Sequence, residues 1–298
     1  MTDRRSFIQT TVVGSAGLLT QNVLGMSSPR RKPVVAMHVW VYSADMPKFD
    51  CMPRIDQIFA DVKYAGIEAV ELMDVSLRQA GAVDKIGEAM ARTGIPVLGA
   101  SYDQPMWDKR KQAQILEDAE LVVGRLAKLK GRLLGISVGN AGREKTGDEL
   151  DTQADTLRNI QSMCRRYNVV PNLHNHTYEV ADDLYDLTGS LERVPDIALG
   201  PDLDWLFQAK VDPITFLDKY GSKVVYTHLR DHRWTGTWTE ALGEGMMDFK
   251  AIAHKFKQVN FQGDIGIELA FPAGFKPTRP IRDSLKMSRA VIQKAFGV

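Results

Sequence analysis

Short apolar runs alternate with amphipathic stretches of helical period along nearly the whole chain. Eight of the runs are expected to be strands, at residues 34–39, 69–72, 96–100, 133–138, 169–173, 197–201, 224–229 and 265–269. The amphipathic stretches predict helices near residues 53–65, 82–93, 110–129, 150–167, 181–192, 212–220, 248–258 and 283–296. Alternation of this kind requires a parallel sheet covered by helices. Eight such units predict an α/β fold, a single (β/α)₈ TIM barrel over residues 33–298, since such barrels typically have about 250 residues.

An open, doubly wound sheet is the competing architecture. Such a sheet usually carries a glycine-rich phosphate loop after an early strand. Neither G-x-G-x-x-G nor G-x-x-x-x-G-K-[ST] occurs in the chain. We therefore favour the closed barrel.

The first 25 residues have the pattern of a twin-arginine export signal. Arg4 and Arg5 precede a weakly apolar stretch at 11–19, and Gly25 ends a passable cleavage site. We expect a signal peptide at 1–25, a short linker at 26–32 and a periplasmic mature protein; the alternative is a cytoplasmic protein with a frayed basic start. No segment reaches the roughly 20 apolar residues that span a bilayer, so we expect no membrane insertion after processing.

Charge and cysteine content exclude several classes of protein. Lys and Arg number 38 against 37 for Asp and Glu, so nothing favours a polyanion such as nucleic acid as a partner. The two cysteines, Cys51 and Cys164, are too few for a disulfide scaffold or a thiolate zinc site. We expect two buried free thiols, although one bridge between them is possible.

Polar side chains gather where the predicted strands end, which is where the active site of a TIM barrel lies. They are His38, Glu71, Asp103, Asn140, His174, Asn175, His176, Asp202, Asp204, His228, Asp231 and Glu268. Carboxylates and imidazoles that converge there would repel or lack partners unless a cation or a proton-sharing network held them. A divalent metal ion is the simplest solution.

Several of these residues lie in motifs that resemble a known family. The motifs include Leu173-His174-Asn175-His176, Asp202 with Trp205, Thr227 to Asp231, Leu242 to Gly245, and Gly266-Ile267-Glu268. In order and spacing they resemble the xylose-isomerase-like barrels, a group that includes sugar phosphate isomerases and epimerases, over about residues 33–296. The resemblance implies a divalent ion held by His174, Asp202, His228 and Glu268. Many members, ketose 3-epimerases among them, have Glu where this chain has His174, and they pair it with the strand-eight Glu as acid and base.

Two imidazoles and two carboxylates suit Mn²⁺, Co²⁺ or Zn²⁺ better than Mg²⁺ or Ca²⁺, and we expect Mn²⁺ first. Such an ion would polarise a sugar carbonyl and acidify the neighbouring C–H bond. The candidate bases are Glu268, His176 and Glu179. Residues two apart on a strand face the same side, so His176 is expected to reach the substrate beside His174.

The expected sugar contacts lie at the same mouth. All five tryptophans follow predicted strands, and flat aromatic faces pack against the apolar faces of sugar rings. The candidate substrate-binding residues are His38, Trp40, Glu71, Trp107, Asn140, Trp205, Arg230, Trp234 and Trp238. An exported enzyme would meet few sugar phosphates, so we expect an unphosphorylated sugar or glycoside as the partner.

Three functions remain open. The first is a metal-dependent sugar isomerase or epimerase that transfers a proton next to a carbonyl. The second is a lyase or hydrolase of an oxidised sugar, of the 3-keto-glycoside or inosose type, in which β-elimination needs only one base. The third is a non-catalytic sugar-binding protein. A metal-dependent endonuclease on the same barrel resembles this chain less well, because it would need a basic groove. The chain could also form a homo-oligomer.

Overall fold

The computed structural model describes residues 31–271 and 274–298, and an eight-stranded parallel sheet forms its centre. The strands are β1 (Val35–His38), β2 (Ala69–Met73), β3 (Val97–Asp103), β4 (Leu133–Ser137), β5 (Val170–Leu173), β6 (Ala198–Leu199), β7 (Tyr226–Leu229) and β8 (Asp264–Ile267). Their order is β6-β5-β4-β3-β2-β1-β8-β7. Isolated parallel bridges join Leu199 to Val224 and Asp202 to His228, which brings the two end strands together. The predicted single (β/α)₈ TIM barrel is confirmed.

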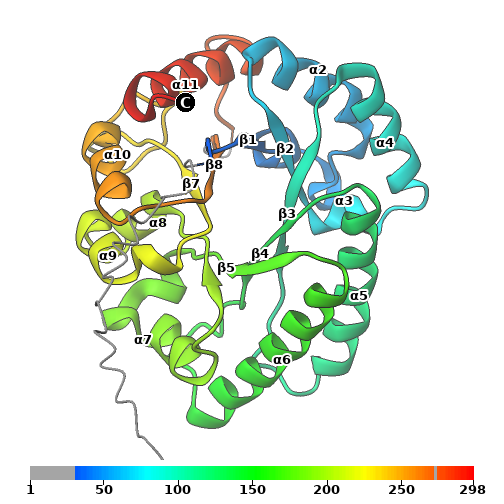
Figure 1. The fold of residues 1–298 in the computed structure, drawn as a ribbon, viewed down its shortest axis with the longest axis vertical. Coiled ribbons are helices and arrows are strands. Elements are labelled where there is room, and N and C mark those ends of the chain that lie inside the picture. Colours follow the sequence, from blue (N-terminus) through cyan, green and yellow to red (C-terminus); the bar gives the residue numbers. More distant parts are fainter. Residues whose placement is uncertain (1–30, 272–273) are drawn as a thin grey trace, which may run out of the picture. The chain divides into compact units, whose positions relative to one another are not determined.

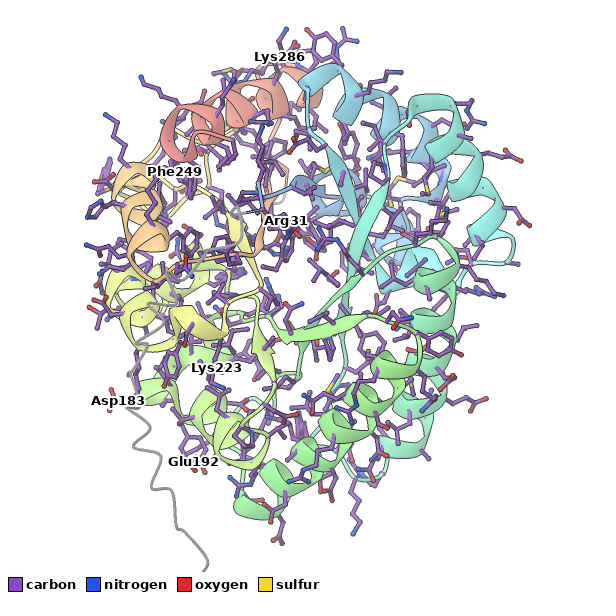
Figure 2. The ribbon with its side chains drawn as sticks, in the orientation of Figure 1. Arg31, Asp183, Glu192, Lys223, Phe249 and Lys286 are labelled. Carbon is purple, nitrogen blue, oxygen red and sulfur yellow. The ribbon has the colours of Figure 1, made fainter. Side chains whose placement is uncertain are left out.

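Helices surround this ring (Figure 1). The long ones are α2 (Ile55–Ala65), α4 (Ala82–Thr93), α5 (Gln112–Lys128), α6 (Gly147–Arg166), α7 (Thr177–Arg193), α9 (Pro213–Tyr220), α10 (Phe249–Gln258) and α11 (Ile281–Phe296). Figure 2 shows Glu192 of α7 and Lys286 of α11 on the outer side of the ring, where both residues are exposed. Gly66 and Gly94 end α2 and α4 in the left-handed conformation that glycine adopts without strain.

Three short helices, α1 (Trp40–Ser43), α3 (Asp74–Arg78) and α8 (Leu203–Gln208), follow β1, β2 and β6 and were not predicted. The start of α7 also differs, because the sequence predicts a helix from residue 181 and the structure begins it at Thr177. The Glu179 side chain accepts a hydrogen bond from the His176 N–H at 2.6 Å, which caps the earlier turn. The predicted strand at 197–201 is shorter than expected, at Ala198–Leu199.

Residues that alternate along the strands divide into two sets, because successive side chains point to opposite faces of a sheet. Val35 and Met37 belong to the main core cluster, which includes residues of the surrounding helices. Their neighbours turn inward, and a small apolar layer fills the barrel there, made of Ala36, Ala69, Leu98, Leu133 and Tyr226. Two residues farther along β1, β2 and β7 come His38, Glu71 and His228. The strands thus place polar groups directly above an apolar floor.

Cys51 and Cys164 are buried free thiols, as expected. Burial raises the pKa of both, to about 12 for Cys164, so neither is a reactive thiolate near neutral pH. No helix in the described part of the chain is long and apolar enough to cross a bilayer. The predicted signal peptide, 1–25, lies outside the described residues.

Gly266 lies where β8 passes closest to the groups inside the barrel. A Cβ atom there would stand 2.4 Å from Tyr226 Oη and 2.7 Å from His228 Cδ2. We expect Gly266→Ala to lower the free energy of unfolding by about 1–3 kcal/mol, the usual cost of overpacking a core. Urea denaturation followed by circular dichroism measures the change.

Gly87→Ala is the matched control, because a Cβ at Gly87 of α4 has no neighbour within 4 Å. Alanine favours a helix interior over glycine by about 1 kcal/mol, so this variant should be at least as stable as the wild type. Equal stability of the two variants would show that the space around Gly266 is not restrictive.

Candidate active site

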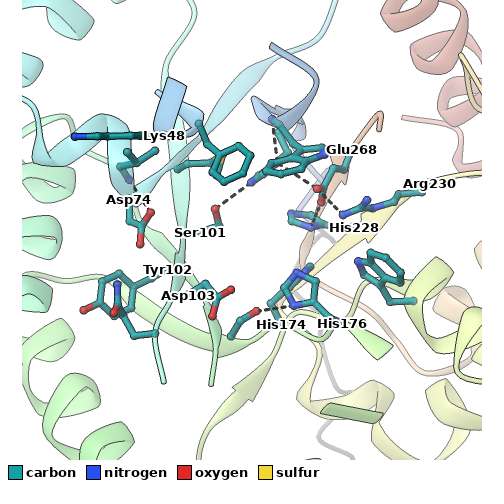
Figure 3. A pocket seen from close by; sticks show the side chains of 18 of the residues that line it. Lys48, Asp74, Ser101, Tyr102, Asp103, His174, His176, His228, Arg230 and Glu268 are labelled. Carbon is teal, nitrogen blue, oxygen red and sulfur yellow. Dashed lines mark hydrogen bonds and ion pairs between the residues drawn. The ribbon is translucent and has the colours of Figure 1, made fainter. Parts of the chain in front are cut away.

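A cavity of about 570 Å³ opens at the carboxyl ends of the strands (Figure 3). Charged and imidazole groups line one side of it: His38, His174, His176, His228, Arg230 and Glu268. Each of these residues comes from the end of a strand or directly follows one. The position agrees with the expected active-site face of a TIM barrel.

Three predicted metal ligands meet beside this cavity. One ligand atom each from His174, Asp202 and His228 lies within 4.8 Å of the other two, and all three side chains are buried. The fourth predicted ligand, Glu268, touches the cluster through its Oε2, 2.7 Å from His228 Nδ1. Four residues that together span almost a hundred positions of the sequence, from His174 to Glu268, thus lie in one place.

The orientation of His228 fits a metal ligand. Its Nε2 lies 2.6 Å from Glu71 Oε2, which also accepts a 2.7 Å hydrogen bond from the Tyr226 hydroxyl. Its Nδ1 is buried and makes no well-directed hydrogen bond to the described residues, although Glu268 is close. A histidine that binds a metal through one nitrogen characteristically donates the other N–H to a carboxylate.

Arg230 lies between two of the carboxylates. It donates from Nε to Asp202 Oδ2 at 2.7 Å and from Nη2 to Glu268 Oε1 at 2.5 Å. A cation bound at His228 Nδ1 would require that ring to be neutral, and the three carboxylates of Glu71, Asp202 and Glu268 would then exceed the one guanidinium by two negative charges. A buried divalent cation would balance them, so the donor set and its charge both fit such an ion.

The pKa values of these residues follow from burial and from their neighbours. Burial alone would lower the pKa of His228, but Glu71 and Glu268 raise it to about 10. Burial, together with the positive charges of His228 and His176, holds the pKa of His174 well below its ordinary value. Burial would raise the pKa of Glu268, but Arg230, His38 and His228 hold it well below the ordinary value. Glu268 is therefore a weak base in this structure.

One ring nitrogen of His176, Nε2, is free to face the cavity, because the other is engaged by neighbouring side chains. Its Nδ1 lies 3.3 Å from Ser137 Oγ and 3.1 Å from the Tyr178 hydroxyl, and Glu179 Oε2 is 3.4 Å away. Nε2 is the nitrogen left to face a ligand. Burial lowers the pKa of His176, but the hydrogen bond and the charge of Glu179 raise it above the ordinary value.

Glu179 does not line the cavity, contrary to its prediction as a base. It is 3% exposed, and its carboxylate accepts hydrogen bonds from the N–H groups of Val138 and His176. Glu71, predicted to contact sugar hydroxyls, is 2% exposed and lies behind His228. Both carboxylates instead position the histidine next to them.

Asn140 is also absent from the cavity wall. It is exposed, and its Oδ1 accepts a hydrogen bond from the Gly142 N–H, because the loop after β4 turns back on itself there. His38 does line the cavity, with Nε2 3.1 Å from Ser101 Oγ and Nδ1 3.4 Å from Glu268 Oε1.

Three of the five tryptophans, Trp40, Trp205 and Trp238, line the cavity. The Arg230 guanidinium carbon lies 5.2 Å from the ring centre of both Trp205 and Trp238. Trp107 and Trp234 do not line it. Trp234 is 84% exposed on the turn of a short hairpin bridged between His232 and Trp238.

That hairpin is held by residues whose roles the sequence did not show. Asp204 is fully buried and accepts hydrogen bonds from His232 Nδ1 and from Trp238 Nε1, which fixes Trp238 against the cavity. Asp231, one of the polar residues expected at the strand ends, accepts hydrogen bonds from four backbone N–H groups, those of His232, Gly243, Gly245 and Met247. Asp231 therefore stabilises the loop that follows β7.

The other side of the cavity was also missed. It is lined by Lys48, Phe49, Met73, Asp74, Val75, Arg78, Tyr102, Asp103 and Gln104, from the loops after β1, β2 and β3. Of these, only Asp103 had been noted at a predicted strand end. Met73 and Tyr102 lie at the ends of β2 and β3, beyond the predicted strands, and the rest lie on loops or on the short helices, where no periodic pattern marks the side that faces the cavity.

The sequence between residues 59 and 291 matches the model of the xylose isomerase-like TIM barrel family, so the chain belongs to that family. Among solved structures it resembles a sugar phosphate isomerase/epimerase from Parabacteroides distasonis, with 14% identity over 92% of this chain and 98% of the other, at a TM-score of 0.71.

Two further structures share the fold. One is a D-allulose 3-epimerase from Methylomonas sp., with 15% identity, coverage of 90% and 99% and a TM-score of 0.73. The other is a 3-keto-D-glucoside 4-epimerase from E. coli, with 19% identity, coverage of 87% and 100% and a TM-score of 0.66. A comparison with curated protein sequences gives no match.

The contact between Glu71 and His228 generates a prediction for metal binding. Glu71→Gln keeps a hydrogen-bond acceptor near Nε2 but removes the charge, so Mn²⁺ affinity should fall by about 10–100-fold. Calorimetric titration of Mn²⁺ into protein stripped with EDTA measures it. Glu88→Gln, on the exposed face of α4, is the control and should bind as the wild type does. Unchanged affinity in Glu71→Gln would mean that this carboxylate does not support a metal ligand.

Proposed function

We propose that this chain is a divalent-metal-dependent sugar isomerase or epimerase that moves a proton next to the carbonyl of an unphosphorylated sugar. The main support is the buried group of His174, Asp202, His228 and Glu268, which carries the donors and the charge that suit a divalent ion. Membership of the xylose isomerase-like family agrees with this function.

His174, Asp202, His228 and Glu268 would hold the ion, with Mn²⁺ as our first choice. When bound, it would polarise the substrate carbonyl and acidify the adjacent C–H bond. Asp202 is already oriented, because its Oδ1 accepts hydrogen bonds from the Asp204 and Trp205 N–H groups. Its pKa is raised by burial to about 6, so it is largely ionised at neutral pH.

His176 is the best-placed base of the three candidates. Glu179 is turned away from the cavity, and Glu268 is occupied by Arg230 and His228. The Nε2 atom of His176 would accept the proton from carbon and return it, while Ser137, Tyr178 and Glu179 hold the ring. Arg230, which also lines the cavity, would stabilise negative charge that develops on a substrate oxygen.

The cavity lacks a free guanidinium for a phosphate group within the described residues. Arg230 is paired with Asp202 and Glu268, and Arg78 with Asp74 and Asp118. The indole faces of Trp40, Trp205 and Trp238 suit the C–H faces of a sugar ring. The paired guanidinium groups and the indole faces favour an unphosphorylated sugar; Lys48 is the cation of the cavity wall that makes no hydrogen bond or ion pair within the described residues. Export to the periplasm stays a proposal from the Arg4-Arg5 pattern alone.

His174→Ala tests the metal centre. We expect the variant to lose most of its bound metal and its activity, because three remaining ligands would hold the ion less tightly than four. Elemental analysis of the purified protein measures the metal. His254→Ala, on an exposed position of α10, should keep both. Full metal occupancy in His174→Ala would remove it from the ligand set.

His176→Gln tests the base, with proton exchange in deuterated water as the measurement. The probes are D-fructose, D-allulose and methyl 3-keto-D-glucoside. The wild type should incorporate deuterium next to the carbonyl and form an epimer or isomer, and His176→Gln should exchange about 10²–10⁴-fold more slowly. Release of methanol from the glycoside would instead indicate elimination. His254→Gln is the control, and exchange at the wild-type rate in His176→Gln would exclude it as the base.

A further inference from the structure

The cavity has a second half that the proposed proton transfer does not use. Figure 3 places Lys48 on the opposite side of the cavity from Arg230. Of the proposed metal ligands and base, His228 lies in β7, and the others lie in the segments after β5, β6 and β8. The opposite wall comes from the ends of β2 and β3 and from the segments after β1, β2 and β3. Pockets that enclose a drug-sized ligand measure about 300–1,000 Å³, and a single sugar ring is much smaller than such a ligand. The cavity of about 570 Å³ therefore has room for more than one ring.

The far wall presents polar groups that have no partner. Lys48 Nζ, the Asp103 carboxylate and the Gln104 side-chain amide make no hydrogen bond to residues 31–271 or 274–298, and all three residues line the cavity. Lys48 and Asp103 are exposed at the mouth of the cavity, so both can reach a ligand that enters it. Together the three offer a cationic donor, an acceptor and an amide, which is a set that suits the hydroxyl groups of a sugar.

A rigid base supports these groups. Arg78 donates hydrogen bonds to Asp74 and Asp118, and its guanidinium carbon lies 5.9 Å from the centre of the Tyr102 ring. The Tyr102 hydroxyl in turn donates to the Ile115 carbonyl. Because these contacts fix Arg78 and Tyr102, the two side chains form a wall of constant shape. The groups available to hydrogen-bond a ligand are then those of Lys48, Asp103 and Gln104.

The rim above this wall is held in an unusual conformation. Lys48 and Phe49 both have positive φ angles, 55° and 58°, although neither is glycine. Phe49 is about half exposed, and its ring lies 5.3 Å from that of Trp40, which also lines the cavity. Left-handed non-glycine residues are strained, and such residues tend to occur at ligand sites. Here the conformation places Lys48 and an aromatic face at the cavity wall.

We infer that this half of the cavity is a binding subsite for a second sugar ring, so that the substrate is a glycoside of at least two rings. Lys48, Asp103 and Gln104 would hydrogen-bond the hydroxyls of that ring, and Phe49 and Trp40 would pack against its face. The inference rests on the proposed function for the first ring and adds the class of substrate.

Calorimetric binding to the Mn²⁺-loaded full chain tests it. The probes are glucose, glucose 6-phosphate and the disaccharides cellobiose, maltose, trehalose and sucrose. At least one disaccharide should bind about tenfold or more tighter than glucose, since each charge-assisted hydrogen bond contributes that much or more. Lys48→Met and Gln104→Leu should each reduce the preferred disaccharide's affinity about tenfold and leave glucose binding unchanged. Lys63→Met, an equal loss of charge on the exposed face of α2, should change neither.

The subsite is refuted if no disaccharide binds about tenfold tighter than glucose, if glucose 6-phosphate alone has the advantage, or if the preference survives in Lys48→Met and Gln104→Leu. Failure of the proposed function has a different signature. A disaccharide preference without deuterium exchange would support the subsite and refute the proposed isomerase or epimerase activity. Deuterium exchange without a disaccharide preference would refute the subsite alone.

Discussion

The site depends on one constraint, which is that charges buried inside a barrel must be balanced there. Arg230 bridges Asp202 and Glu268, and His228 lies between Glu268 and Glu71. Removing one member of such a group leaves another charge buried without a partner, which costs several kcal/mol. The arrangement therefore tolerates little change, and residues that never meet a ligand become essential to it. Tyr226 and Gly266 are of this kind, since one donates to Glu71 and the other leaves space for the Tyr226 ring.

The two halves of the barrel mouth differ in how firmly the structure holds their side chains. The proposed metal ligands and the proposed base lie in β7 or after β5, β6 and β8, where hydrogen bonds and buried carboxylates restrict the side chains. The opposite wall lies on the ends of β2 and β3, on loops and on the short helix α3, and it includes exposed polar groups such as Lys48 and Asp103. Chemistry needs fixed geometry, whereas the recognition of a particular glycoside can vary with loop sequence. The structure keeps these two requirements on separate elements.

The part of the site that the sequence predicted lies at or just after the strand ends, which a (β/α)₈ barrel gathers at one face, and inside the strands periodicity shows which side chains turn inward. Ala36 and His38, Ala69 and Glu71, and Tyr226 and His228 are pairs two residues apart, so an inward-facing apolar residue identifies an inward-facing polar one. Prediction failed where loops decide. Asn140 and Trp234 follow strands in the sequence, but the first lies in a turned-back loop and the second on an exposed hairpin turn. Lys48 could not be found in this way, because its place at the cavity depends on a left-handed backbone that no local pattern indicates.

The histidine at position 174 has consequences for charge as well as for the base. A carboxylate there would add a further negative charge beside those of Glu71, Asp202 and Glu268, whereas the His174 imidazole adds none. Arg230 meanwhile binds both Asp202 and Glu268. With His174 the site also has no carboxylate at this position to act as one of a pair of bases. In the proposed reaction His176, two residues along and with a free nitrogen at the cavity, would accept the proton instead.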